Sequence, residues 1–106
     1  MQPDVTIHEV NVEIRRVVDR LDSMPLHRAA MAGPACHETA RVLVARTREL
    51  TDEIPPDAVP PKLEPQGLGS MVAVLGDDYL DAARASGTAD LGPVLDALVE
   101  LRRALP

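Results

Sequence analysis

The chain has 106 residues, a formal net charge of −6 and 45% hydrophobic residues, with one tyrosine and neither phenylalanine nor tryptophan. This composition is typical of one globular domain and excludes a disordered chain. The acidic charge and the single aromatic residue argue against binding to nucleic acid, which needs a basic surface and stacking side chains.

Cysteine usage and hydropathy favour a cytoplasmic protein. Cys36 is the only cysteine, so no disulfide forms within the chain, as is usual in a reducing compartment. The first ten residues lack the basic and apolar regions of a signal peptide. The longest strongly apolar run, 71–75, is far shorter than a membrane span. We therefore expect a single cytoplasmic domain over 1–106, without a membrane partner.

The first predicted element is a helix that begins near residue 7. Thr6 and Glu9 have the spacing of a capping box. Alternating apolar residues over 10–14 would also suit a strand, but the cap and the length of the apolar stripe favour a helix. That stripe alternates intervals of three and four residues: Ile7, Val10, Ile14, Val17, Leu21 and Met24.

Proline and glycine residues divide the next stretch. Ser23 is a candidate cap for a short helix over 26–32, because Pro25 is tolerated near a first turn. Gly33 is expected to end this short helix, and Pro34 to open the next. A second main helix is then predicted over about 35–54, with this stripe: Cys36, Ala40, Leu43, Thr47, Leu50 and Ile54.

A proline-rich connection follows over about 55–67. Five prolines exclude a regular helix or a central strand, so we predict an extended crossover or strap. Such a segment is long enough to span the preceding helix, which would make the second and third helices parallel. The antiparallel arrangement is the alternative that the sequence leaves open.

Two more helices complete the prediction. The third begins near 68 or 71, with Ser70 as a candidate cap, and ends at Gly87. The fourth follows a short turn with Thr88 or Asp90 as its cap, so the two should form an antiparallel pair. The predicted apolar faces are Leu68, Met71, Val72, Leu75, Tyr79, Ala82 and Ala83, and then Leu91, Val94, Leu98, Leu101 and Leu105. The fold class is therefore all-α: four main helices in a bundle, with one short extra helix.

Asp77, Asp78 and Asp81 form an Asp-Asp-x-x-Asp arrangement in the third helix. Carboxylates at this spacing hold magnesium and a diphosphate when they face a cavity with basic residues opposite. At 100° per residue they lie about 200–300° from Leu75, on the side away from the apolar face. We therefore expect a solvated face on which Asp81 pairs with Arg84, and retain the aspartates only as weak metal candidates.

A second candidate cluster contains soft ligands: Met24, His27, Met31, Cys36 and His37. Cysteine and methionine suit Cu(I), and cysteine with histidine suits zinc. However, no C-x-x-C or H-x-x-x-H pair occurs, and the adjacent Cys36 and His37 point to different helix faces. A helix N-terminus would lower the pKa of the Cys36 thiol, but its place on the apolar stripe favours a buried structural thiol.

Two further groups of residues bear on partners. The arginines of the first two helices are expected to be solvated among acidic residues, with a small anion-binding patch as the alternative. These are Arg15, Arg16, Arg20, Arg41, Arg46 and Arg48, among Glu9, Glu13, Asp19 and Glu49. Apolar residues beside the stripes indicate wide core faces or an interface: Val12, Val18, Val42, Val44 and Val99.

The sequence favours a non-enzymatic protein–protein interaction module, a regulatory or accessory subunit whose partner is another protein or a second copy in a homodimer, with no cofactor. One alternative is a helical bundle that binds a small ligand or a metal through the soft-ligand cluster or the aspartates. The other is a magnesium-dependent enzyme that uses Asp77, Asp78 and Asp81.

Overall fold

The computed structural model describes residues 5–51, 64–87 and 89–106. Their secondary structure consists of four α-helices and one short 3-10 helix: α1 (Ile7–Asp22), α2 (Leu26–Leu50), η1 (Pro65–Gly67), α3 (Leu68–Ser86) and α4 (Gly92–Ala104). The prediction of an all-α bundle of four main helices with one short extra helix is confirmed. The extra helix precedes α3, however, instead of following α1.

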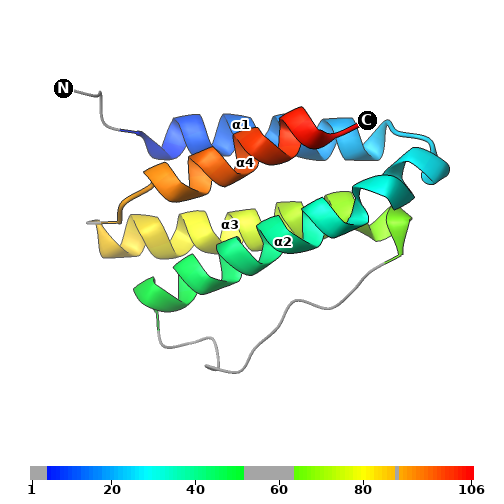
Figure 1. The fold of residues 1–106 in the computed structure, drawn as a ribbon. Coiled ribbons are helices and arrows are strands. Elements are labelled where there is room, and N and C mark those ends of the chain that lie inside the picture. The colour runs from blue at the N-terminus through cyan, green and yellow to red at the C-terminus, as the bar shows by residue number, and fades with distance from the viewer. Residues whose placement is uncertain (1–4, 52–63, 88) are drawn as a thin grey trace.

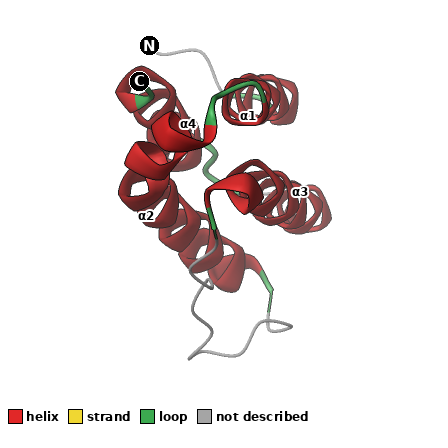
Figure 2. Ribbon diagram, turned by 90° about the vertical axis from the view of Figure 1, so that its right-hand side faces the viewer, coloured by secondary structure: helices red, strands yellow, loops and turns green. Residues whose placement is uncertain are grey.

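The helices form a four-cornered bundle with an unusual order of neighbours. α1 and α4 run in one direction, and α2 and α3 in the other (Figure 1). α1 and α2 each pack against both α3 and α4, so α1 lies diagonally across from α2, and α3 diagonally across from α4 (Figure 2). α2 and α3 are therefore parallel, one of the two arrangements that the sequence left open. α3 and α4 are antiparallel as predicted, but they are diagonal instead of adjacent.

The two ends of α1 are fixed by side-chain hydrogen bonds. Thr6 is the N-cap, and its Oγ1 accepts a hydrogen bond of 3.1 Å from the backbone N–H of Glu9, which confirms the predicted cap. Ser23 lies at the other end of α1, where its Oγ donates to the carbonyl oxygen of Asp19 at 2.7 Å. The prediction that Ser23 caps the following helix is wrong, since Pro25 occupies that N-cap position.

α2 continues through the point where the sequence predicted a break. Gly33 does not end a helix, and Pro34 lies inside one. Proline costs about 3 kcal/mol in a helix interior, because it lacks the N–H that would bond to the carbonyl of Ala30. The buried stripe nevertheless crosses Pro34 without a change of phase, and its burial offsets that cost: Ala29, Ala32, Cys36, Ala40, Leu43 and Thr47. At its other end α2 stops at Leu50, and Ile54 lies outside the described residues.

Most of the predicted proline-rich crossover, residues 55–63, also lies outside the described residues. Its last part is not extended as predicted, because Pro65–Gly67 forms η1. α3 begins directly afterwards at Leu68, and Gly87 ends it with a φ of 70°, the left-handed conformation expected of a terminating glycine. Asp90 Oδ1 accepts from the N–H of Gly92 at 3.1 Å, so this predicted cap serves the start of α4 although the N-cap residue is Leu91. Thr88 lies outside the described residues.

The core consists of the aliphatic stripes that the sequence predicted, arranged around one tyrosine. All five stripe residues of α4 and its two caps are buried, and among the described residues Tyr79 is the largest fully buried side chain. Gly76 lets α1 approach α3 closely, because a Cβ atom at this position would lie 2.8 Å from Cδ1 of Ile14. Among the described residues, no helix is long and apolar enough to cross a membrane.

Candidate functional site

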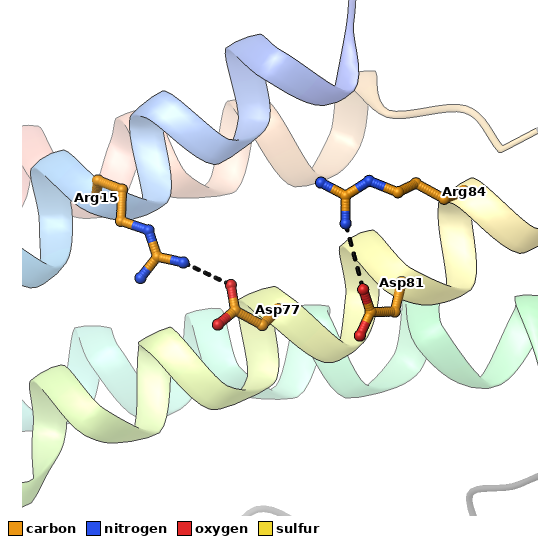
Figure 3. Close-up of polar contacts among 4 residues, drawn as sticks. All are labelled: Arg15, Asp77, Asp81 and Arg84. Carbon is orange, nitrogen blue, oxygen red and sulfur yellow. Dashed lines mark hydrogen bonds and ion pairs between the residues drawn. The ribbon is translucent and has the colours of Figure 1, made fainter.

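Two of the three clustered aspartates are paired with arginines (Figure 3). Arg15 of α1 donates to Oδ1 of Asp77 at 2.7 Å, and both side chains are about half exposed. Asp81 pairs with Arg84 at 3.2 Å on the surface of α3, as predicted, and is 78% exposed. These carboxylates therefore lie on a solvated face of α3, and Asp77 joins that face to α1.

Asp78 and Asp81 also border a groove of about 500 Å³ between α3 and the last turns of α2. Its α2 wall consists of Thr47, Leu50 and Thr51. A magnesium–diphosphate site needs basic side chains opposite the carboxylates, and none lines this groove within the described part of the chain. No three His, Cys, Asp or Glu side chains there are arranged to hold a metal ion.

The structure disperses the candidate soft ligands. Cys36 is fully buried, whereas Met31, on the same helix, is 72% exposed. His27 is exposed, and Met24 packs at the edge of the core. The Nδ1 of His37 lies 2.7 Å from the carbonyl oxygen of Gly33 one turn earlier. These five residues therefore do not converge on one point.

The thiol of Cys36 is buried and unreactive in this fold. Since α2 begins at Leu26, Cys36 lies well inside the helix and not at its N-terminus, contrary to the sequence-based expectation. Burial raises the pKa of the Cys36 thiol to about 11, because the charged thiolate is poorly solvated in the core. The thiol is protonated at neutral pH and packs as a small apolar side chain, as its place on the stripe predicted.

A buried ion pair between α1 and α4 was missed by the sequence analysis. Glu13 was expected at the surface, but its side chain is only 5% exposed. Its carboxylate accepts hydrogen bonds from Arg16 at 3.3 Å and from Nε of Arg102 on α4. The expectation failed because α4 covers this flank of α1. Glu13 is paired with both arginines, so the cluster joins α4 to α1. None of its three charged groups is left without a partner.

A second surface groove, the α2–α4 groove, is mainly apolar. It measures about 370 Å³ and is lined by Ala35, Glu38, Thr39 and Val42 of α2 and by Ala97, Glu100, Leu101 and Ala104 of α4. α2 and α4 run antiparallel on either side of this groove (Figure 1). Ala35 lies on the α2 wall, and Ala97 and Ala104 lie on the α4 wall. Val42 was singled out in the sequence as an apolar residue beside the core stripe, and it is the one signal that pointed to this groove.

Exposed large apolar side chains lie on α2 and α3. Leu26 and Met31 of α2 are 62% and 72% exposed, and Val74 of α3 is 58% exposed. Met31 precedes Ala35 by one helical turn, so it lies on the same face of α2, next to the α2–α4 groove. Comparison of the chain with protein-family models, with curated proteins and with solved structures found no match.

Proposed function

We propose that this chain is a small acidic cytoplasmic module that acts by binding another protein, as a regulatory or accessory subunit without chemistry of its own. The observation that carries the proposal is a second apolar stripe on α2, which lies beside the buried stripe, is interrupted by Glu38 and meets the edge of the core at Ala35. Met31 and Ala45 on this stripe are exposed, and Ala35 and Val42 between them are half-buried at the α2–α4 groove. A helix with apolar residues on both faces is typical of one that packs inside its domain and against a partner.

The condition of the reactive groups supports a binding role. Asp77 and Asp81 are paired with arginines, and the raised pKa of Cys36 keeps its thiol protonated at neutral pH. A nucleophile or a general acid–base pair needs an activated group that faces a site for substrate. The lone cysteine also supports a reducing compartment such as the cytoplasm.

Paired surface variants test the proposal. Met31→Asp places a charge on the outer stripe of α2, whereas Val74→Asp places the same charge at an exposed valine of α3. Tagged wild type and both variants would be purified from the native cells, and the partner-bound mass measured by native mass spectrometry. We expect a stoichiometric protein partner that Val74→Asp retains and Met31→Asp loses, with equal thermal stability of the two variants.

Three results would count against the proposal. The first is recovery of the wild type with no partner and no self-association, and the second is equal retention of the same partner by both variants. A mass that shows a bound metal ion or small molecule in place of a protein would favour a ligand-binding bundle.

A further inference from the structure

We infer that the α2–α4 groove binds an amphipathic helix whose apolar stripe is flanked by lysine or arginine side chains. The inference rests on the proposed function and specifies the chemistry of its partner. The shape of the groove, the charges on its walls and the pairing of the chain's own basic residues all favour such a helix.

The shape of the groove fits a helix that lies along it. Ala35 on one wall and Ala97 and Ala104 on the other leave a depression between two antiparallel helices, and the buried Leu101 and Thr39 also line it. Small side chains allow helix axes to approach to about 8 Å. Residues 35–42 extend about 11 Å at 1.5 Å per residue, which matches two turns of a bound helix. Two turns present apolar anchors at i, i+3, i+4 and i+7.

The charges on the walls determine which helix fits. Glu38 on α2 and Glu100 on α4 line opposite walls of the groove, and both side chains are exposed. Glu38 is paired with Arg41 at 2.9 Å, whereas Glu100 forms no ion pair within the described residues. Acidic side chains on both walls of one groove, one of them without an ion pair among the described residues, attract a cationic side chain of a ligand that lies between them. The apolar contacts then supply most of the affinity, and the carboxylates select a basic partner.

A second copy of the chain fits this groove less well. Two α2–α4 grooves packed face to face would bring Glu38 and Glu100 of both copies together, in a chain whose net charge is −6. Many of the basic side chains that could offset these charges are engaged within their own chain. The arginines in ion pairs are Arg15, Arg16, Arg41, Arg46, Arg84 and Arg102.

Two synthetic helical peptides would test the inference. Both carry the same leucine and alanine stripe, and one is flanked by lysines and the other by glutamates. Binding would be measured by fluorescence anisotropy, and its place by amide chemical shifts of the ¹⁵N-labelled protein. We expect the lysine peptide to bind at least about tenfold more tightly than the glutamate peptide. The shifts should centre on Ala35, Val42 and Ala97.

Variants of the protein separate the charge contribution from the apolar one. Glu38→Gln and Glu100→Gln should each lower the affinity for the lysine peptide by about two- to fivefold, and this effect should be smaller at high salt. Ala97→Glu should abolish binding because it fills the groove with a charge. Ala85→Glu is the matched control, since Ala85 lines the other groove, between α2 and α3, and should leave binding unchanged.

Several outcomes would overturn the inference. They are equal binding of the two peptides, no binding of either, or loss of binding with Ala85→Glu but not with Ala97→Glu. A concentration-dependent dimer that Ala97→Glu disrupts would assign the groove to a second copy. A native partner could be lost with Met31→Asp and yet bind Ala97→Glu and both glutamine variants with unchanged affinity. In that case the proposed function stands and this inference fails. If no native partner exists at all, the proposed function fails first.

Discussion

The α1–α3 interface and the α2–α4 interface both use very small residues, with opposite results. In the first, small residues of α3 meet large residues of α1, and Ile14 fills the space above Gly76. In the second, Ala35 of α2 and Ala97 and Ala104 of α4 lie on opposite walls, and a groove remains. A small residue closes a helix pair when a large residue lies opposite, and leaves a vacancy when the opposite residue is also small.

The two flanks of the bundle therefore have different roles. The α1–α3 flank contributes to stability, because close packing fills its volume. The outer α2–α4 surface contributes little to the core and offers an apolar depression between two acidic side chains. The following predictions test this division, beginning with the largest expected effect.

A valine introduced at each of the two interfaces should have unequal effects. Gly76→Val forces a branched side chain against Ile14, and we expect the free energy of unfolding to fall by about 3 kcal/mol. Ala97→Val adds volume to the open groove and should change the free energy of unfolding by no more than about 0.5 kcal/mol. Urea unfolding followed by far-UV circular dichroism measures both. Equal losses would show that the groove is packed as tightly as the α1–α3 interface.

The core-facing side of α2 should be sensitive to alkaline pH. The pKa of Cys36 is raised from 9.0 to about 11, so the unfolded chain loses this proton first as the pH rises. Stability is fully present below pH 9 and falls as the pH approaches 11, by about 2–3 kcal/mol in total. Burial and the nearby Asp90 also raise the pKa of Tyr79, so its phenol adds a loss above pH 10.

Cys36→Ala is the control for this pH dependence. Urea unfolding at several pH values between 8.5 and 10 should give a flatter profile for the variant than for the wild type, because Tyr79 titrates later. Parallel profiles over that interval would mean that the thiol is not buried as described.

The edge of α4 that faces α1 should respond asymmetrically to removal of its ion pair. Glu13 is the buried member, and Arg102 is one-third exposed. Arg102→Met leaves a buried carboxylate with Arg16 alone and should cost about 2 kcal/mol. Glu13→Met leaves an arginine that can reach water, and should cost about 1 kcal/mol or less. Thermal unfolding of both variants tests this order, and the reverse order would place the buried charge on the arginine instead.

The surface pair at the α1–α3 edge should have the smallest effect. Asp77→Asn removes the partner of Arg15, and we expect a loss of about 0.5 kcal/mol that shrinks at high salt. Asp78→Asn changes the net charge equally on the same helix without touching that pair. A difference of zero between the two variants would show that the pair makes no contribution to the interface.

Much of the fold was predictable because its causes are local. The Thr6 cap, the Gly87 terminator and the apolar stripes each depend on residues within a few positions of one another. The exposure of Asp77 and Asp81 likewise followed from helix periodicity.

The features that the sequence analysis missed depend on tertiary packing. The environment of Glu13 is set by Arg102, which is 89 residues away in the chain. Gly33 was expected to end one helix and Pro34 to open the next, because both residues are typical of helix ends, whereas the burial of the stripe on both sides of Pro34 keeps α2 continuous. The α2–α4 groove forms only when two helices that are distant in the sequence pack side by side. Among its residues, only Val42 gave a signal in the sequence.

The burial of the single aromatic side chain makes this protein convenient for spectroscopy. Tyr79 is 1% exposed, and the chain contains no tryptophan or phenylalanine. Ultraviolet emission of the molecule therefore originates from one phenol at the centre of α3, without energy transfer to tryptophan. Its intensity and its access to collisional quenchers would report the opening of the core in an unlabelled sample, while a bound tryptophan-containing peptide would be read in a separate spectral window.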